Sequence, residues 1–374
     1  MTKLEQLIEE LCPNGVEYTT VGECCNISAG GDVPKDRFSK EKTDFYSIPI
    51  ISNGIGENAL YGYTDSPKIT ENAVTVAARG TIGYAEYRDY PYYPIIRLLS
   101  LIPKNPEKMS AKFLFYSLQG REYPVPKSGI PQLTAPNIKK EVIPLPPLPV
   151  QSEIIRILDN FTELTAELTA ELTARKKQYE YYRDFLFANA KDAVSITLDK
   201  ISENCDAQRK PVTSGKREAG DIPYYGASGI VDYVKDYIFD GDYLLVSEDG
   251  ANLLARNTPI AFSISGKTWV NNHAHILKFD EYDTRRYVEI YLNSIDLSYY
   301  ITGGAQPKLN QKNLNKIEIP LPPLDEQKRI VAILDRFDTL CNDISAGLPA
   351  EIEARQKQYE YYRDKLLTFK EASV

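Results

Sequence analysis

The sequence predicts a mixed α/β protein in which two globular domains are separated by a pair of long coiled-coil helices, all built from one internal repeat. Three observations predict this fold class. A decapeptide, RKKQYEYYRD from Arg175, returns as RQKQYEYYRD from Arg355. A proline-rich block followed by a helical pattern precedes each copy. The remaining stretches consist of short β-rich runs separated by Gly and Asn, which is typical of globular domains.

Composition and charge limit the function classes. The chain has 374 residues, 43% hydrophobic and 26% charged, which fits a soluble protein with two domains of ordinary size. No window approaches the ~18 uncharged apolar residues of a membrane span. The five Cys show no CxxC spacing, which favours a reducing cytoplasm over a disulfide framework or a zinc site. A net charge of −8 argues against one large basic face, so nucleic-acid binding would need local patches or a partner's positive charge.

The two globular domains are predicted from their short runs. We expect residues 1–142 to hold an N-terminal helix and the first domain, and residues 191–318 to hold the second. Strands are predicted at YSIPII, AVTVAA, DYLLVS and PIAFSI, with turns at SNGIGEN, ARGTIG, YGASG and SEDGAN. Short helices are predicted at KMSAKFLFYSLQG and TRRYVEIYLNSI. The two domains share a layout of predicted elements but differ in their loops. This pattern indicates two copies of one scaffold that recognise different targets.

The proline-rich blocks match residue by residue. PNIKKEVIPLPPLPVQSEIIRILDNFTEL begins at Pro136 and KNLNKIEIPLPPLDEQKRIVAILDRFDTL begins at Lys312. The match extends upstream, where SGIPQLTAPN from Ser128 faces GGAQPKLNQKN from Gly303. Because prolines end any preceding element and cannot sit inside a helix, we expect each helix to begin after its prolines.

Residues 143–190 are predicted to hold the central helix, running from Gln151 to Ala188. Its apolar residues recur with coiled-coil spacing, and polar Thr165 and Arg175 occupy two positions of the seam. The apolar seam residues are Ile154, Leu158, Phe161, Leu168, Leu172, Tyr179, Tyr182 and Leu186. The run LTAELTAELTA is a four-residue repeat of good helix formers.

Residues 319–374 are predicted to hold the C-terminal helix. It contains Gly347–Pro349, read as GLP, so we expect it to kink or break there and to resume at Ala350. We expect the two helices to pack against each other, since their apolar seams need burial.

Motifs of common catalytic chemistry are absent from the sequence. There is no GxxxxGK[ST] loop, no GxGxxG opening a helix, and no Asn/Asp-Pro-Pro-aromatic motif of a methyltransferase. The two histidines are His273 and His275, and alternation predicts that both lie on one face of a strand, where they could bind a metal or a base edge. No third ligand is evident nearby, so we expect no metal site and no catalytic residues. The sequence favours a binding protein over an enzyme.

The order of these motifs resembles the DNA-specificity subunit of type I restriction-modification systems. The residues that carry the resemblance are IPLPPLPVQSEIIRILD, IPLPPLDEQKRIVAILD, the TAEL repeats and the two QYEYYRD segments. AVTVAARGTIG, and GDYLLVSEDGANL followed by GKTWVNNHAHIL, look like the family's recurrent frame. The resemblance covers nearly the whole chain.

The resemblance implies two target-recognition domains related by a pseudo-twofold axis, each reading one half of a split site in double-stranded DNA. Two methyltransferase subunits would dock on the repeated regions, and restriction/translocase subunits would join them. S-adenosylmethionine, ATP and Mg²⁺ would be bound by these partners, so we expect no cofactor on this chain. The complex would be cytoplasmic and independent of any membrane.

Polar and basic side chains beside Gly-rich turns are the candidate DNA contacts, because Arg and Asn pair bidentately with guanine and adenine edges. They are Lys35, Arg37, Asn53, Arg79 and Thr81 in the first domain, and Tyr225, Asn252, Arg256, Asn271, Asn272, His273 and Lys308 in the second. The candidate partner contacts are the repeated aromatics Tyr179, Tyr181, Tyr182, Tyr359, Tyr361 and Tyr362. For those on the seam, the alternative role is packing in the core of the coiled coil.

Two other function classes stay open at this point. A symmetric scaffold that joins two identical partners without reading DNA fits the repeat and the helices, but it leaves the divergence of the two domains unexplained. A modification enzyme that acts alone would need the cofactor loop that the sequence lacks.

Overall fold

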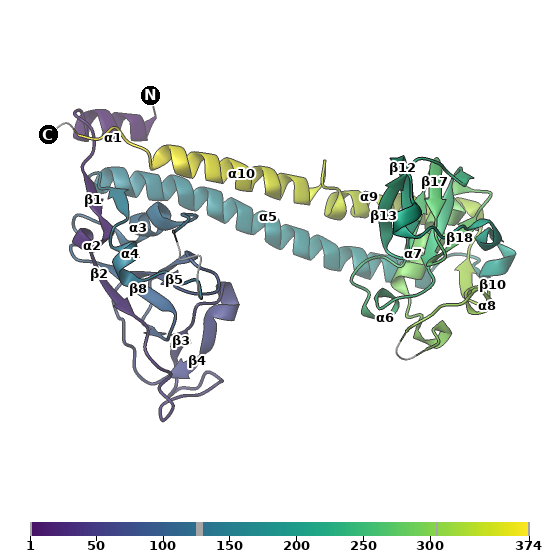
Figure 1. Ribbon diagram of the computed structural model, residues 1–374, viewed down its shortest axis with the longest axis horizontal. Helices are drawn as coiled ribbons and strands as arrows, with labels where there is room; N and C mark the ends of the chain where they lie inside the picture. Colours follow the sequence, from purple (N-terminus) through teal and green to yellow (C-terminus); the bar gives the residue numbers. More distant parts are fainter. Residues whose placement is uncertain (1, 125–129, 304–305, 373–374) are drawn as a thin grey trace. The chain divides into compact units, whose positions relative to one another are not determined.

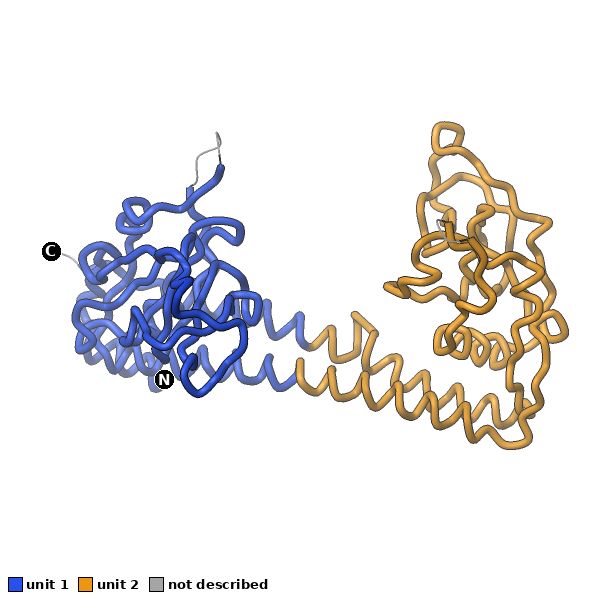
Figure 2. Tube along the Cα trace, turned by 90° about the horizontal axis from the view of Figure 1, so that it is seen from below, with its two compact units in different colours: residues 1–168, 352–374 blue, residues 169–351 orange. Residues whose placement is uncertain are grey.

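The computed structural model describes residues 2–124, 130–303 and 306–372, and the chain divides into two compact units. Unit 1 comprises residues 1–168 and 352–374, and unit 2 comprises residues 169–351 (Figure 2). Each unit therefore combines one globular domain with parts of the long helices. Of the sequence segments matched above, SG from Ser128 and GA from Gly304 lie outside the described residues.

Unit 1 contains two main sheets (Figure 1). One has the strand order β2-β8-β5-β6, and the other has the order β4-β3-β7. All neighbours are antiparallel except β3 and β7, which are parallel. The bounds are β2 (Cys25–Ala29), β3 (Ile48–Ile51), β4 (Leu60–Thr64), β5 (Ala73–Ala77), β6 (Ala85–Arg88), β7 (Tyr93–Pro94) and β8 (Leu98–Pro103).

Unit 2 repeats this arrangement. Its sheets have the orders β11-β18-β15-β16 and β13-β12-β17-β14, and β12 and β17 form the parallel pair. The bounds are β11 (Glu203–Asn204), β12 (Ala219–Gly226), β13 (Gly229–Val234), β14 (Phe239–Asp240), β15 (Tyr243–Ser247), β16 (Ala261–Ile264), β17 (Lys267–Val270) and β18 (Ala274–Lys278). The shared strand order confirms the predicted repeat of mixed α/β domains, with β14 as an addition in unit 2.

One helix packs on the four-stranded sheet of each unit. It is α3 (Ala111–Leu118) in unit 1 and α7 (Tyr282–Ser294) in unit 2; α3 lies within its predicted segment, and α7 begins two residues before the predicted Thr284. Four predicted strands are likewise present as β3, β5, β15 and β16. Strand β5 is buried along its whole length because both of its faces are covered. Val74 and Val76 pack in one core cluster with Phe113 of α3, and Ala73 packs in a second cluster with Ile51 and Tyr92.

A two-stranded antiparallel sheet joins each domain to its helix. In unit 1, β1 (Tyr18–Thr20) pairs with β9 (Val142–Pro144). In unit 2, β10 (Val194–Thr197) pairs with β19 (Glu318–Leu321). The first prolines of each block then end the pairing, and helices α5 (Leu148–Ala188) and α9 (Leu324–Asn342) begin. Helix α5 starts before the predicted Gln151 and includes Pro149, because a proline in the first turn lacks only an N–H that would have no helical partner.

The glutamine of each LPPLxxQ motif forms hydrogen bonds that hold the start of the long helix against its domain. Gln151 and Gln327 are both buried. The Nε2 of each donates to the carbonyl oxygen of the first proline of its own motif, at 2.7 Å. Gln151 Oε1 accepts from Ser110 N, at the N-cap of α3 (2.9 Å), and Gln327 Oε1 accepts from Thr284 Oγ1, in the first turn of α7 (2.7 Å). The same side chain therefore fixes the helix start to the domain in both units.

The C-terminal helical segment is broken where the sequence predicts. After α9 ends, α10 (Leu348–Leu366) begins directly behind Gly347. A Cβ on Gly347 would lie 2.5 Å from Thr339 O and 2.7 Å from Asp343 O, so the turn requires glycine. The helix resumes at Leu348 and not at Ala350, because a proline in the first turn lacks only an N–H that would have no helical partner there.

Equivalent aromatic contacts join the helices within each unit. In unit 1, Phe161 stacks on Tyr362 with 5.5 Å between ring centroids. In unit 2, Phe337 stacks on Tyr182 at 5.8 Å. The polar seam residue Thr165 bonds its own helix, donating from Oγ1 to Phe161 O at 2.9 Å. The predicted seam is therefore the contact surface, although Tyr182 remains 39% exposed at its edge.

The two ends of the chain meet in unit 1. Val16 N donates to Lys370 O at 2.8 Å, and Ala372 N donates to Val16 O at 3.0 Å. The preceding helix α1 (Lys3–Leu11) is the expected N-terminal helix, and a capping box of Thr2 and Glu5 begins it.

The remaining helical elements are short. They are α2 (Val21–Cys24), α4 (Ala135–Ile138), α6 (Asn252–Ala255), α8 (Gln311–Leu314), η1 (Gly56–Ala59), η2 (Leu198–Lys200), η3 (Asp206–Gln208), η4 (Ser214–Lys216) and η5 (Ser298–Tyr300). In the part of the chain that the structure covers, no helix combines the length and apolar character needed to cross a bilayer.

Candidate nucleic-acid interface

Three of the five candidates in unit 1 lie together on two neighbouring loops. Asn53 follows β3, and Arg79 and Thr81 follow β5. Asn53 Nδ2 donates to Arg79 O at 2.7 Å, and Thr81 Oγ1 donates to Asn53 O at 2.8 Å. Gly80, with φ +71, lets the second loop turn sharply between them. These bonds fix the backbone from which the Arg79 side chain projects.

A residue that was absent from the sequence-based candidates completes this group. Arg79 Nε and Nη2 both donate to Gln132 Oε1, at 3.0 and 2.6 Å. Gln132 is held in place because the next residue, Leu133, is fully buried and donates its N–H to Ala78 O at 2.9 Å. In the alignment of the two repeat copies Gln132 corresponds to Lys308, which is a candidate DNA contact, and this correspondence could have identified Gln132 from the sequence.

The other two candidates of unit 1 are exposed and separate from this group. Arg37 forms an ion pair with Asp65, with Nη2 2.7 Å from Oδ1. That contact raises the pKa of Arg37 and lowers the pKa of Asp65. Lys35 lies two residues earlier on the same exposed loop. Among the described residues, no hydrogen bond or ion pair connects either side chain to Arg79.

In unit 2, the loops after β12 and β15 and before β18 meet in the same way. Asn271 N donates to Tyr225 O at 3.0 Å, and Asn271 Oδ1 accepts from His273 N at 2.8 Å. His273 O accepts from Glu248 N at 2.8 Å. Asn272 is exposed within this turn. The structure therefore brings Tyr225, Asn271, Asn272 and His273 into one group.

Two side-chain contacts with carboxylates cross this group. His273 Nδ1 lies 2.9 Å from Asp249 Oδ1, and the His273 side chain is about half exposed. Lys308 Nζ lies 3.0 Å from Glu248 Oε1. Leu309 N donates to Glu248 O at 2.8 Å, as Leu133 N does to Ala78 O in unit 1. Lys308 thus joins the group from the opposite segment.

The last two candidates, Asn252 and Arg256, bond within their own loop. Asn252 Nδ2 donates to Thr258 O at 2.9 Å, and its Oδ1 accepts from Thr258 N at 3.0 Å. Arg256 has left-handed backbone geometry, and its Nη2 donates to Ile295 O at the end of α7 (2.7 Å). Burial lowers the pKa of Arg256. These bonds give both residues a structural role, while contact with DNA stays a prediction.

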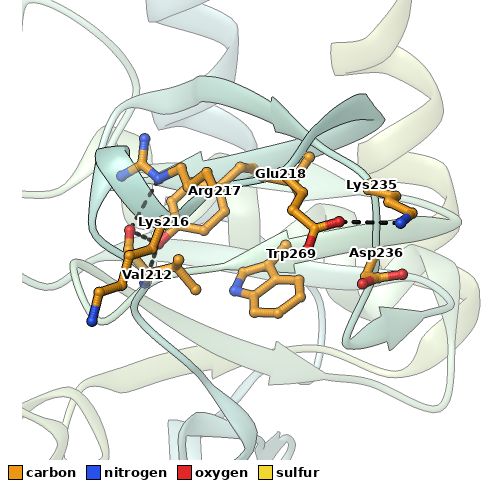
Figure 3. A pocket seen from close by; sticks show the side chains of 9 residues that line it. Val212, Lys216, Arg217, Glu218, Lys235, Asp236 and Trp269 are labelled. Carbon is orange, nitrogen blue, oxygen red and sulfur yellow. Dashed lines mark hydrogen bonds and ion pairs between the residues drawn. The ribbon is translucent and has the colours of Figure 1, made fainter.

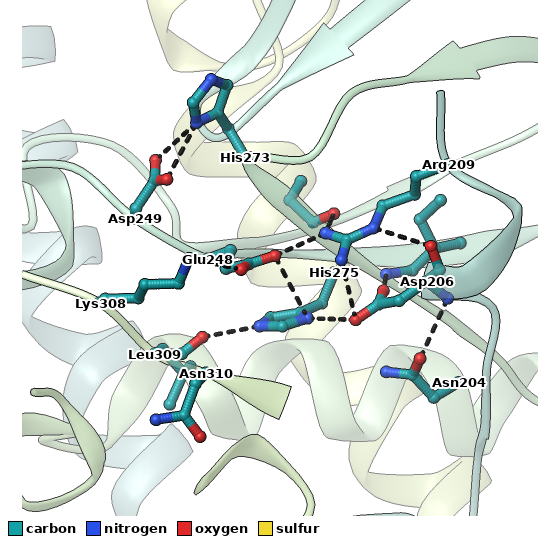
Figure 4. Close-up of polar contacts among 12 residues, drawn as sticks. Asn204, Asp206, Arg209, Glu248, Asp249, His273, His275, Lys308, Leu309 and Asn310 are labelled. Carbon is teal, nitrogen blue, oxygen red and sulfur yellow. Dashed lines mark hydrogen bonds and ion pairs between the residues drawn. The ribbon is translucent and has the colours of Figure 1, made fainter. Parts of the chain in front are cut away.

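The two histidines do not share a strand face, so that prediction is wrong. His273 lies in the turn before β18, whereas His275 lies inside β18 and is 1% exposed. Figure 4 shows His273 pointing to Asp249, apart from the His275 cluster. Alternation fails here because the strand begins only at Ala274.

A buried network of ionisable side chains lies beside the unit 2 loops (Figure 4). His275 Nε2 donates to Leu309 O at 2.7 Å, and its Nδ1 lies 2.5 Å from Asp206 Oδ2. Burial would raise the pKa of Asp206, but the contact with His275 outweighs burial and the pKa is lowered. Burial also opposes ionisation of Glu248, whose pKa is lowered by hydrogen bonds from Arg209 and Lys308.

Three members of this network also form a possible metal-ligand set. Asp206, Glu248 and His275 each offer one ligand atom, and these atoms lie within 4.8 Å of one another. However, Arg209 Nη1 is 2.6 Å from Glu248 Oε2, and its Nη2 is 3.4 Å from Asp206 Oδ2. An ion would have to displace that guanidinium. The donor set therefore fits a structural ion network better than a metal centre.

A small pocket of about 130 Å³ lies on the second sheet of unit 2 (Figure 3). Arg217 stacks on the Tyr224 ring at 4.3 Å, and Trp269 Nε1 donates to Lys210 O at 2.6 Å. Lys235 forms an ion pair with Glu218 at its rim. The pocket is smaller than the roughly 300–1,000 Å³ of typical ligand sites, and Arg217, Glu218 and Lys235 in its lining are already engaged in ion pairs.

The repeated tyrosines divide into two classes. Tyr179 and Tyr359 are half-buried beside the domain cores of their units. Tyr181 and Tyr361 are 65% and 62% exposed, off the seam. Tyr181 also stacks on exposed Phe185, at 6.3 Å between centroids. Packing within the units therefore explains the seam residues, whereas Tyr181 and Tyr361 make only ring contacts with neighbours on their own helices and leave most of their surface exposed.

Comparison with known proteins gives consistent matches. The family described as the type I restriction modification DNA specificity domain matches twice, over residues 13–175 and 191–354. The type I restriction enzyme EcoR124I/EcoR124II specificity subunit of Escherichia coli is 31% identical over 410 residues, covering 99% of this chain and 97% of that protein. A putative type I restriction enzyme specificity subunit of Haemophilus influenzae is 40% identical over 178 residues, which are 46% of each chain.

Solved structures match as well. The crystal structure of a type I restriction-modification system S subunit from M. genitalium has a TM-score of 0.61 at 17% identity, and the alignment covers 94% of this chain and 96% of that one. At this level of identity the likeness concerns the fold.

Proposed function

This chain belongs to the family of type I restriction-modification DNA specificity subunits, and from that premise we propose that each unit reads one half of a bipartite site in double-stranded DNA. Members of this family recognise DNA and leave catalysis to other subunits. The reading domains proposed here are residues 1–142 and 191–318.

One observation carries the proposal. Both units place the same loops on the same strand order, yet equivalent positions hold side chains of different charge. Arg79 and Gln132 in unit 1 correspond to Asp249 and Lys308 in unit 2. A scaffold that only joins two partners would have no use for this difference. Two readers of different half-sites require it, because base edges differ in their donors and acceptors.

Partner docking is the second part of the proposal. Two methyltransferase subunits dock on the repeated helical segments, and Tyr181 and Tyr361 supply exposed aromatic contacts to them. Support comes from their equal positions in the repeat and from their exposure of 65% and 62%. Exposed aromatics off a packed seam are typical of protein interfaces. Restriction/translocase subunits then join this core.

The partners also supply what this chain lacks. A net charge of −8 disfavours binding to the negatively charged DNA backbone, so much of the attraction to the phosphates comes from the methyltransferase subunits. S-adenosylmethionine, ATP and Mg²⁺ are bound by the methyltransferase and restriction/translocase subunits, and the complex works in the cytoplasm. The isolated chain should bind DNA weakly and with strong salt dependence.

A domain exchange tests the reading function. Residues 16–142 are replaced by those of a relative, and the chimaera is produced with its methyltransferase subunit in a host whose genome is read by methylation-aware sequencing. One half-site should change and the other should stay. A change in both halves, or in neither, would overturn the assignment of one domain to one half-site. Sequence-independent gel shifts with the methyltransferase present would favour the scaffold instead.

A further inference from the structure

The loop that follows β5 in unit 1 meets the segment before α4 through one side-chain pair, Arg79 and Gln132. The corresponding loops of unit 2 meet through the same backbone bond but carry Asp249 and Lys308. Because both units share this backbone arrangement, the two pairs occupy equivalent positions and differ only in the chemistry of their side chains.

The Arg79–Gln132 pair offers only hydrogen-bond donors. A Gln amide oxygen has two lone pairs, and Arg79 Nε and Nη2 approach Gln132 Oε1 at 3.0 and 2.6 Å. These contacts also fix which end of the amide faces the arginine, since a guanidinium cannot accept. The Gln132 NH₂ group is therefore directed away from the arginine. What remains for a ligand is N–H groups from both side chains.

Arg79, like Arg256, has no carboxylate partner among the described residues, whereas several other arginines of this protein do. Arg37, Arg209 and Arg217 each pair with a carboxylate, at 2.7, 2.6 and 2.9 Å. For Arg79, the described residues provide the neutral amide of Gln132 and no carboxylate within ion-pair distance. A half-buried guanidinium without a counter-charge favours an electron-rich acceptor in its vicinity.

The pair is held rigidly. Asn53 donates to the Arg79 carbonyl oxygen, and buried Leu133 fixes the backbone beside Gln132. The backbone beneath both side chains is therefore fixed, and their two mutual hydrogen bonds orient them before binding, which is what a selective contact needs.

Among the four bases, guanine matches a donor-only group best. In the major groove guanine presents two acceptors, N7 and O6, whereas adenine pairs one acceptor with a donor, cytosine presents a donor, and thymine has one acceptor. We propose that Arg79 and Gln132 together read a guanine in the half-site recognised by unit 1, with Gln132 as an additional specificity-determining residue. This inference rests on the proposed function of unit 1 as a DNA reader.

The equivalent pair in unit 2 has a different preference. Asp249 contributes acceptors, and Lys308 is engaged by Glu248 at 3.0 Å. The donor-only reading therefore applies to one half-site and not to both.

The test uses the complex of the full chain with its methyltransferase subunits. Methylation-aware sequencing gives both half-sites, and the exchange of residues 16–142 identifies the one that unit 1 reads. Binding is then measured with duplexes in which each guanine of that half-site is replaced in turn by 7-deazaguanine, which lacks N7. At one guanine the affinity should fall about 10- to 100-fold, as for loss of a bidentate base contact.

Two variants complete the experiment. Gln132→Glu keeps the side-chain shape but replaces the NH₂ group by an acceptor, so discrimination at that guanine should fall about 10-fold or more while the second half-site is still read. Lys308→Gln is the matched control: it changes the equivalent position of the unit 2 reader, so it should leave discrimination at the guanine of the first half-site unchanged. Thermal unfolding shows that each variant is folded, and Gln132→Ala gives a second measurement if Gln132→Glu is not.

The outcomes separate this inference from the proposed function. If the wild-type complex binds no specific sequence, the reading function itself fails. If it does, but the first half-site contains no guanine, or none that is sensitive to 7-deazaguanine, or if Gln132→Glu retains full discrimination, only the assignment to Arg79 and Gln132 fails.

Discussion

The two motif glutamines allow a quantitative comparison, because the same residue has different partners in the two units. Gln151 is fully buried and bonds three backbone groups: Pro146 O and Lys108 O accept from Nε2, both at 2.7 Å, and Ser110 N donates to Oε1 at 2.9 Å. Gln151→Leu would leave all three without that partner. At about 1–3 kcal/mol for each unpaired group, and with partial relief by water, we expect a loss of about 3–5 kcal/mol in the stability of unit 1.

Gln327→Leu should cost less. Its side chain bonds one backbone group, Pro322 O, and one hydroxyl, Thr284 Oγ1, both at 2.7 Å. A hydroxyl can rotate to another acceptor, so one unpaired carbonyl oxygen remains and we expect a loss of about 1–2 kcal/mol in unit 2. Leucine has nearly the volume of glutamine, so cavity effects are small in both variants.

Hydrogen exchange measured by mass spectrometry distinguishes the two effects. In Gln151→Leu, protection should fall around Lys108–Ser110 and at the start of α5, while unit 2 stays as in the wild type; Gln327→Leu should show the reverse with a smaller change. Urea unfolding of both variants gives the free energies. Equal losses, or a larger loss for Gln327→Leu, would show that the count of bonded backbone groups does not determine the cost.

Three further predictions concern the helices. One additional Thr-Ala-Glu-Leu unit after Ala174 lengthens α5 by about 6 Å and turns its far part by roughly 40°. Since a base pair turns about 34–36°, we expect the same half-sites one base pair further apart; undiminished methylation of the original site would contradict this. Ala at Tyr181 and Tyr361 should weaken assembly with the methyltransferase subunit, seen by native mass spectrometry, at unchanged thermal stability; unchanged assembly would remove both from the interface. Finally, hydrogen bonds from Arg156 and from a lysine of α1 lower the pKa of Glu153 to about 2 from 4.5, so this contribution is present above pH 4.5 and lost toward pH 2. Because both cations are exposed, we expect this ion pairing to contribute about 1 kcal/mol to stability. Urea unfolding measured as a function of pH should show the contribution in the wild type and not in Glu153→Gln.

Most of the fold could be predicted because its signals are local or repeated. The prolines of each motif place the helix starts, and Gly347 places the break between α9 and α10 because no other residue fits against Thr339 O. The apolar spacing from Ile154 to Leu186 predicts the seam, since helix periodicity depends on near neighbours only. The alignment of the two copies predicts that both domains share one strand order.

The candidate site could be predicted only in part, since it depends on contacts between distant segments. Nothing local distinguishes Arg79, which bonds Gln132, from Arg256, which bonds Ile295 O and closes its own domain. The burial of His275 depends on Asp206 and Leu309, which lie far away in the chain. Alternation around His273 was misleading because the strand starts one residue later than the pattern suggests.

The divergence of the loops is possible because other contacts keep the frame the same. Asp159 in α5 binds Lys112 of α3 at 2.7 Å, and its repeat equivalent Asp335 in α9 accepts from Arg286 of α7 at 2.7 Å. These ion pairs, like the hydrogen bonds of the motif glutamines, join the long helix to the sheet-covering helix and its N-terminal turn, and they involve none of the reading loops. A substitution at Gln132 or Lys308 therefore changes donors and acceptors at a base edge without loosening the junction that positions them. Separation of the supporting contacts from the reading contacts gives such a chain two independent half-site specificities on one architecture.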